Sequence, residues 1–177
     1  MNVKLAYGRS HLTVALPDER TTVIAPSNNP GLPDEKAAVI SALQAPMGAP
    51  PLREFLHATH RVCIAFTDLT RATPNERIIP WLLEFMDGLV PRENITLLNQ
   101  LGTHRPNTRA ELETMLTPQV MANYRVLNHE PENPDALLQL GTTRDGTPAL
   151  INRHLVEADV PVEHVAGFDP SFENIGQ

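Results

Sequence analysis

The feature that most constrains the fold is an alternation of apolar runs and helical segments between residues 62 and 116. The runs VCIAF (62–66) and ITLLN (95–99) are continuously apolar, and a stretch with helical spacing follows each of them. Strands that are separated by helices pair in parallel, because each connection must cross back over the sheet. Continuous apolar runs are typical of strands that are covered on both faces. The sequence therefore predicts an α/β fold with a mostly parallel sheet and helices on both of its faces.

Shorter sequence patterns on either side of residues 62–116, and two residues within that range, predict further details of the fold. The segment VKLAYGRSHLTVALP (3–17) predicts a small N-terminal β-hairpin, and helices are expected over 35–43 and 52–59. Pro80 lacks an N–H, so the helix around it is expected to start near Ile79 or to kink there. Thr108 and Glu111 have the spacing of a capping box at the start of the next helix.

The last third of the chain predicts further strands. YRVLN (124–128) reads as one strand, and LLQLGTTRDGTPALIN (137–152) as two strands joined by a turn at Asp145-Gly146. Asn152 is expected to cap a short helix. After Val160 the pattern contains no recognisable element.

Length and charge narrow the functional classes. A chain of 177 residues fits one domain, and its net charge of -7 argues against nucleic acid as a partner. No apolar run approaches a membrane span, and the first residues do not read as a secretory signal, so a cytoplasmic protein is expected. Cys63 lies within an apolar run and is expected to be a buried structural thiol.

Candidate functional residues follow the two best strands. Ligands of open parallel sheets bind beyond the carboxyl ends of the strands, where Asp68 and Arg71 follow the first strand and His104 and Arg105 follow the second. A carboxylate, guanidinium groups and an imidazole suit a small anionic substrate with a proton to be moved. For either loop taken alone, a structural salt bridge is an equally open interpretation.

Four segments, TDLTRATP, ENITLLNQLGTHRPNTRAELETML, YRVLNHEP and LGTTRDGTPALINRHLVEAD, occur in that order. Together they resemble the N-terminal domain of the nickel-dependent lactate racemase family over about residues 7–159. The resemblance implies racemisation or epimerisation of a small 2-hydroxy acid, by hydride transfer to a nickel pincer nucleotide. In that family the domain supplies half of the site, and a C-terminal domain, in the same chain or a separate one, supplies the rest.

The resemblance also implies residue roles. His104, in GTHRP, matches the first of two histidines that alternate as base and acid, and Arg71 matches the residue that grips the substrate carboxylate. Asp68 matches the acidic partner that orients His104 and favours its charged form. The second catalytic histidine would be His164, although the segment around it is shorter than in the family, and a surface position is the alternative.

The cofactor-anchoring residues of the family have no counterpart in this sequence. Lysine occurs only at positions 4 and 36, upstream of the region where the cofactor-bearing lysine belongs. We therefore expect the C-terminal domain to be absent, no nickel pincer nucleotide bound by this chain alone, and no metal site. His57 and His60 could contact a metal but lack a third ligand, while His129 and His154 are expected to be structural.

Three functions remain open at this point. The chain could be the substrate-binding half of a racemase that is inactive alone, a stand-alone carboxylate-binding module without catalysis, or a half-site too open to bind anything measurably.

Overall fold

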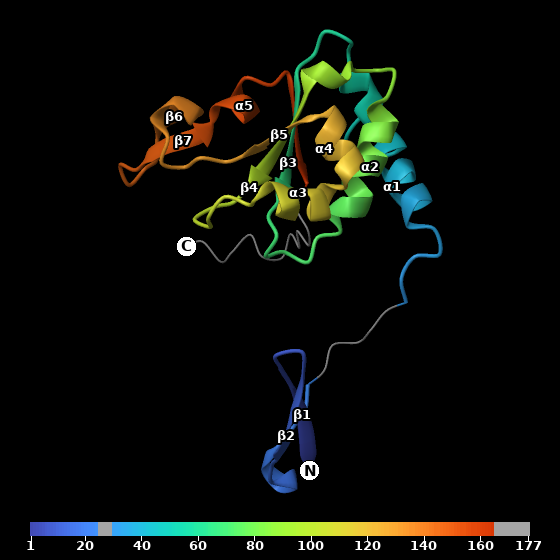
Figure 1. Ribbon diagram of the computed structural model, residues 1–177, viewed down its shortest axis with the longest axis vertical. Coiled ribbons are helices and arrows are strands. Elements are labelled where there is room, and N and C mark those ends of the chain that lie inside the picture. The colour runs from blue at the N-terminus through green and yellow to red at the C-terminus, as the bar shows by residue number, and fades with distance from the viewer. Residues whose placement is uncertain (25–29, 165–177) are drawn as a thin grey trace. The chain divides into compact units, whose positions relative to one another are not determined.

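The computed structural model describes residues 1–24 and 30–164, which belong to two compact units, Met1–Pro33 and Asp34–Gln177. In the first unit, β1 (Asn2–Tyr7) and β2 (Ser10–Ala15) pair antiparallel, and η1 (Asp18–Arg20) follows (Figure 1). Gly8 has a φ of 56° in the two-residue turn, a conformation that glycine adopts without steric cost. The predicted hairpin is confirmed, and whether both units act as one domain stays a prediction.

The second unit contains a four-stranded sheet of order β5-β4-β3-β8, in which every neighbouring pair is parallel. Its strands are β3 (Val62–Thr67), β4 (Ile95–Gln100), β5 (Arg125–Asn128) and β8 (Val160–His164). Separately, β6 (Leu137–Thr142) and β7 (Pro148–Asn152) form an antiparallel pair, and Gly146 in their turn has a φ of 90°.

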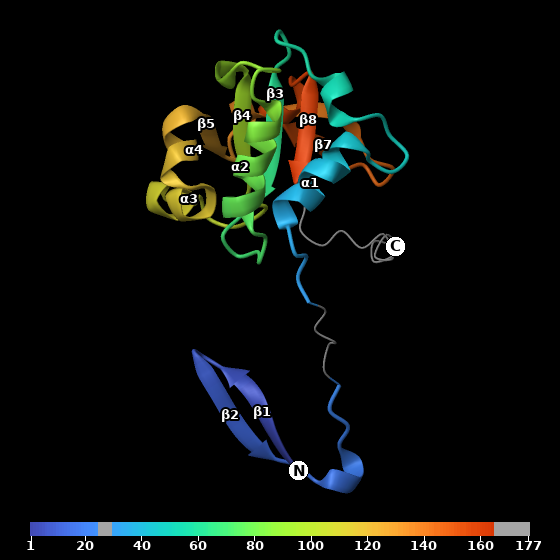
Figure 2. The same ribbon diagram turned by 90° about the vertical axis from the view of Figure 1, so that its right-hand side faces the viewer.

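Helices cover both faces of the parallel sheet, as the sequence predicts (Figures 1 and 2). On one face lie α1 (Glu35–Gln44), α2 (Asn75–Met86), α3 (Arg109–Leu116) and α4 (Pro118–Asn123). On the other face α5 (Arg153–Val156) contacts β3, and Asn152 caps it by accepting a hydrogen bond from the N–H of His154. The 3-10 turns η2 (Leu52–Phe55), η3 (Arg92–Asn94) and η4 (Pro134–Ala136) complete the described elements.

The main core lies between the sheet and the four helices. Side chains of β3 alternate between the faces, so Val62, Ile64 and Phe66 all point toward the helices and are buried. Facing them, α2 contributes an apolar stripe that includes Ile79 and Met86, both fully buried. Removing this much apolar surface from water is the main stabilising contribution to such a unit, at about 25 cal/mol per Å².

The start of α2 differs from the prediction. The helix begins at Asn75 and Pro80 lies inside it, so a start near Ile79 is wrong, while the alternative, a kink at that place, stays a prediction. Pro80 removes one backbone hydrogen bond, but the buried stripe on either side of it keeps the segment helical because packing outweighs local propensity.

Three further segments differ from the structure that the sequence predicts. Only Leu52–Phe55 is helical in the expected 52–59 helix, and α4 was not predicted. The strand β8 was also missed. Pro161 lies within it, which is tolerated because β8 is at the edge of the sheet formed by the described residues and pairs there only with β3.

Candidate functional site

The loops that follow β3 and β4 leave the same edge of the sheet. The two strands are parallel and in register, and their last residues, Thr67 and Gln100, are opposite each other. The loop after β3 therefore lies beside the loop after β4, as expected for the ligand-binding edge of an open parallel sheet. This arrangement brings Asp68 and His104 together although 36 residues separate them.

Asp68 is a buried carboxylate at the centre of this edge, with only 3% of its surface exposed. Its Oδ1 accepts hydrogen bonds from the hydroxyl of Thr70 at 2.8 Å and from the N–H of Thr70 at 3.2 Å. Burial works against the ionised form, but the hydrogen bonds from His104 and Thr70 outweigh it and hold the pKa of Asp68 below its ordinary value. Asp68 is therefore ionised at neutral pH.

His104 is the partner of that carboxylate. Its Nδ1 lies 2.5 Å from Oδ2 of Asp68, while 43% of the side chain remains exposed. Because an ionised carboxylate can only accept, Nδ1 carries the proton, and the lone pair of the neutral ring is on Nε2. The contact thus holds the ring by Nδ1 and leaves Nε2 as the nitrogen that can accept a proton.

A tight turn positions His104. The N–H of His104 donates to the carbonyl of Leu101 at 3.0 Å, and Gly102, the first central residue of the turn, has a φ of 57°. A Cβ at Gly102 would meet nothing within 4 Å, so the backbone conformation, and not space, requires glycine here.

Arg71 stands at the end of the other loop. Its N–H donates to the carbonyl of Asp68 at 3.1 Å, so the carboxylate residue also shapes the turn that carries the arginine. Arg71 is exposed, and within residues 1–24 and 30–164 its guanidinium makes no hydrogen bond or ion pair. A guanidinium group can bind an anion bidentately.

Arg105 has a structural partner instead. Its guanidinium forms two hydrogen bonds with Glu111, at 2.7 and 2.9 Å, and Glu111 also accepts from the N–H of Thr108 in the predicted capping box. These contacts lower the pKa of Glu111 to about 2. Of the two interpretations of Arg105, the salt bridge is the one observed.

A buried amide network beneath the His104 loop was not predicted. The side-chain amide of Asn99 donates to Oδ1 of Asn107 at 2.8 Å and to Oδ1 of Asn128 at 3.0 Å, and that of Asn128 donates to the carbonyl of Asn107. Asn99 is the last residue of the apolar run ITLLN. A polar residue at the end of a buried strand is the signal that could have predicted the amide network. The network ties the end of β4 to the loop that returns from His104.

His164 is the last described residue and ends β8, where its backbone is opposite Phe66 of β3. Its backbone thus reaches the same edge of the sheet, but its side chain lies outside the described part of the structure. The assignment of His164 as a second base stays a prediction.

Two of the other histidines, His57 and His60, contact each other. The rings of His57 and His60 make an edge contact with centroids 5.1 Å apart, in a loop rather than a helix, and His60 bonds the carbonyl of Phe55. Across the described part of the chain, no three His, Cys, Asp or Glu side chains come together as metal ligands. Cys63 is buried, and burial raises the pKa of its thiol to about 11, in agreement with a structural role.

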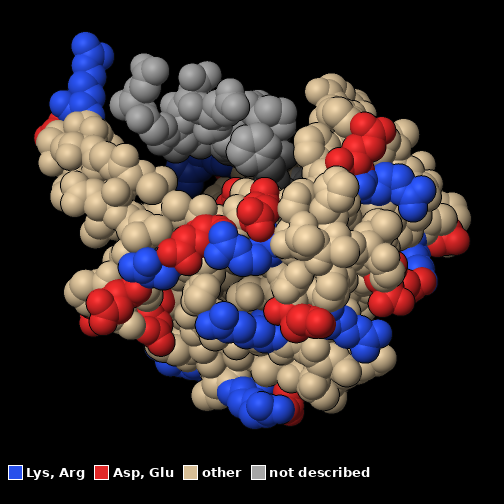
Figure 3. Space-filling model, turned by 90° about the horizontal axis from the view of Figure 1, so that it is seen from above, with Lys and Arg blue, Asp and Glu red and all other residues tan. Residues whose placement is uncertain are grey.

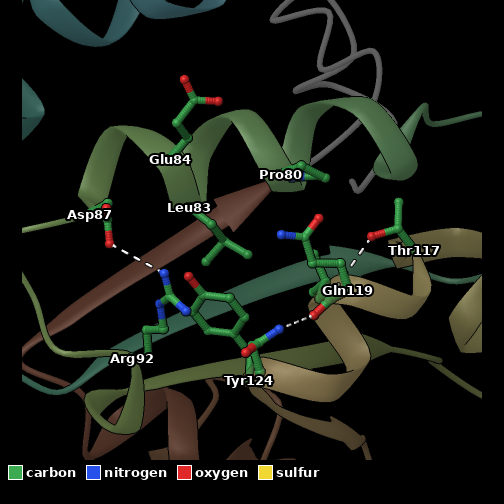
Figure 4. A pocket seen from close by; sticks show the side chains of 10 residues that line it. Pro80, Leu83, Glu84, Asp87, Arg92, Thr117, Gln119 and Tyr124 are labelled. Carbon is green, nitrogen blue, oxygen red and sulfur yellow. Dashed lines mark hydrogen bonds and ion pairs between the residues drawn. The ribbon is translucent and has the colours of Figure 1, made fainter.

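A separate hollow of about 270 Å³ lies among α2, η3 and α4 (Figure 4). Arg92, which lines it, precedes β4, whereas His104 follows β4, so the hollow belongs to the opposite edge of the sheet. Its main charges pair with each other, since Arg92 lies 3.7 Å from Asp87. This hollow therefore has no link to the Asp68 and His104 pair.

The surface charge and the length of the helices can be described directly. On the face drawn in Figure 3, basic and acidic side chains are interspersed, and neither sign gathers into a patch. No helix within residues 1–24 and 30–164 has the length and apolar character needed to cross a membrane.

Comparison with known proteins gives a consistent result. The profile of the lactate racemase N-terminal domain matches residues 7–166. The chain is 29% identical to lactate racemase of Thermoanaerobacterium thermosaccharolyticum and 26% identical to that of Lactiplantibacillus plantarum, over 91% and 89% of its own length. In both cases it spans 38% of the relative.

Solved structures agree with this result. The lactate racemase apoprotein of T. thermosaccharolyticum superposes with a TM-score of 0.80 at 29% identity, covering 92% of this chain and 38% of that one. A crystal structure of a Thermotoga maritima protein superposes with a TM-score of 0.60 at 25% identity, covering 75% of this chain and 34% of that one.

Proposed function

Since the chain belongs to the family of lactate racemase N-terminal domains, we propose that it is the substrate-binding, first-base half of a 2-hydroxy acid racemase or epimerase. The observation that carries this proposal is the buried carboxylate of Asp68, 2.5 Å from Nδ1 of His104, at the edge of the sheet that also bears Arg71. The remainder of the site would come from the C-terminal part of the family enzyme, in the same chain or in a separate one, and this half alone would not turn over.

Each residue has a distinct role in the proposal. Arg71 binds the carboxylate of the 2-hydroxy acid through two parallel hydrogen bonds, which fixes the orientation of the reacting carbon. Nε2 of His104 then accepts the proton of the substrate hydroxyl. Asp68 stays ionised, holds the ring in the required tautomer and stabilises the imidazolium that forms. Removing this proton is needed because a hydride leaves the adjacent carbon readily only as the hydroxyl becomes a carbonyl.

The family's hydride acceptor is a nickel pincer nucleotide, and the contacts of Lys36 do not fit an anchor for it. Nζ of Lys36 is 2.8 Å from both carboxylate oxygens of Glu84, on α1 and α2, and the described residues hold no cluster of metal ligands. We therefore assign to this chain only substrate binding and proton transfer.

A binding module without catalysis is less well supported. Holding a carboxylate requires Arg71 alone, whereas the Asp68 and His104 pair has the arrangement of a general base and its orienting group. Burying the carboxylate of Asp68 is costly unless it is hydrogen-bonded. A module that only binds a carboxylate through Arg71 has no need of such a buried, hydrogen-bonded aspartate.

Protein-observed NMR titration with lactate tests the binding part of the proposal. Shifts are expected in the two loops that carry Arg71 and His104. Arg71→Ala should weaken binding by roughly ten-fold or more, because it removes a bidentate charge-assisted contact. Arg144→Ala, in the exposed β6–β7 turn, is the matched control and should leave the affinity unchanged. Equal losses in both variants, or shifts confined to other surfaces, would contradict the proposal.

A further inference from the structure

The loop after β5 continues the row of loops at the candidate site. Along this edge of the sheet the strands are ordered β3, β4, β5, so the loop of Arg71 is followed by that of His104 and then by that of His129. An open groove of about 950 Å³ lies between the last two loops. His104, Pro106, His129, Pro131 and Glu132 are among the residues that line it. The groove thus begins at the proposed base and extends away from Arg71.

His129 presents a defined hydrogen-bond donor in this groove. Oδ1 of Asn152 accepts from the N–H of His154 at 2.9 Å, so the amide group of Asn152 must be the part that lies 3.0 Å from Nδ1 of His129. An amide N–H₂ can only donate, so Nδ1 accepts and the ring proton is on Nε2. Burial lowers the pKa of His129, which keeps the ring neutral at pH 7.

The charge in the groove is negative. Glu130 and Glu132 lie along one wall, and the positive charge of Arg105 on the other wall is already paired with Glu111. A second carboxylate on a substrate would be repelled here. Hydroxyl groups are suited to it, since they accept from His129 and donate to glutamates, while their carbon chain can lie against Pro106 and Pro131.

We propose that this groove is the subsite that binds the tail of the substrate, and that it selects 2-hydroxy acids with an extended, uncharged, hydroxylated tail. This proposal rests on the proposed function. With the carboxylate on Arg71 and the 2-hydroxyl on His104, the tail continues toward His129. The methyl group of lactate has no oxygen that could accept a hydrogen bond from His129.

Binding measurements with three acids test this subsite. Protein-observed NMR titrations of the chain use lactate, ribonate as a five-carbon hydroxylated acid, and malate as an acid with a second carboxylate. Ribonate should bind roughly five-fold or more tighter than lactate, because it adds hydrogen bonds to His129 and the glutamates, and malate should bind no tighter than lactate.

Two variants and one spectrum make the test specific. His129→Phe should reduce ribonate affinity to the level of lactate and leave lactate binding unchanged. Glu132 is exposed, and Glu132→Gln removes one negative charge from the groove. This variant should therefore raise malate affinity by roughly three-fold. The ¹⁵N spectrum of the His129 ring at pH 7 should identify Nδ1 as the unprotonated nitrogen.

The outcomes separate this proposal from the one on which it rests. Lactate binding that requires Arg71, with ribonate no tighter, would overturn the proposed subsite alone. No binding of any of the three acids would contradict both proposals. Equal losses of lactate and ribonate in His129→Phe, or a proton on Nδ1, would also overturn the subsite.

Discussion

Replacing Asp68 with asparagine tests the physical account of the candidate site. The side chain keeps its size, and its remaining oxygen can still accept from Thr70. What disappears is the negative charge that accepts from Nδ1 of His104. The neutral amide can also place an N–H₂ against that nitrogen, which would favour the wrong tautomer of the ring.

The magnitude follows from the contacts. A hydrogen bond to a charged group contributes about 1.5–3 kcal/mol when it is buried. Asp68 is 3% exposed, but the side chain of His104 is 43% exposed and water can replace part of the lost bond. We therefore expect Asp68→Asn to lower the free energy of unfolding at pH 7 by about 1–2 kcal/mol. For a chain of this length that corresponds to a Tm lower by roughly 2–8 °C.

The effect should depend on pH in a known direction. The pKa of Asp68 is lowered by folding, so its contribution to stability is present above the pKa of the unfolded chain, about 3.9. The contribution is lost as the pH falls through the lower pKa of the folded state. The difference between the wild type and Asp68→Asn should therefore be full at pH 7 and decline below about pH 3.9.

Urea unfolding of both proteins between pH 2.5 and pH 7 is the assay, with ¹H–¹⁵N spectra to confirm that each variant is folded. Asp87→Asn, at an exposed aspartate that lies 3.7 Å from Arg92, is the matched control and should change stability by well under 1 kcal/mol. The reasoning would be refuted by a destabilisation that is the same at pH 3 and pH 7, or by none at pH 7.

Three further predictions concern the surroundings of the site. Asn99→Ala should lower the free energy of unfolding by about 1–2 kcal/mol in urea titrations, since it leaves Oδ1 of the buried Asn107 and Oδ1 of the half-buried Asn128 without their donor, and a loss under 0.5 kcal/mol would show that the network is not structural. Gly102→Ala should cost about 1 kcal/mol because its φ is 57°, and shifts in the amide spectrum should be centred on the His104 turn and absent from β6 and β7. Cys63 should react with a thiol reagent at pH 7 only in denaturant, since it is buried with a pKa near 11, and fast labelling of the folded chain would contradict this.

Much of the fold was predictable because local signals and packing agree. The runs 62–66 and 95–99 became β3 and β4, the Thr108 and Glu111 spacing became a capping box, and Asp145-Gly146 became the β6–β7 turn. In each segment the apolar pattern, the turn residues and the cap favour the same structure.

Three of the four segments that differ from the prediction contain proline. Pro80 lies within α2, Pro118 begins α4, and Pro161 lies within β8. Sequence rules treat proline as an interruption, and only tertiary packing or an edge position in the sheet makes it acceptable. For α4 the signal was present, because Thr117 followed by Pro118 is a typical N-cap and first helical residue.

The candidate site was predictable in its residues but not in its geometry. The placement of Asp68, Arg71 and His104 at the ends of neighbouring parallel strands follows from the fold class. The family resemblance predicts that Asp68 orients His104, whereas the length of that contact and the pairing of Arg105 with Glu111 depend on loop conformations that no periodic pattern encodes.

The most direct test of the central claim is a turnover assay by complementation. The chain is mixed with the remaining, C-terminal part of a lactate racemase and with preformed cofactor, and interconversion of the lactate enantiomers is followed. We predict racemisation that His104→Ala abolishes and His57→Ala preserves. Retained turnover in His104→Ala, or its complete absence with the wild-type chain, would contradict the claim that this chain carries the first base of a 2-hydroxy acid racemase.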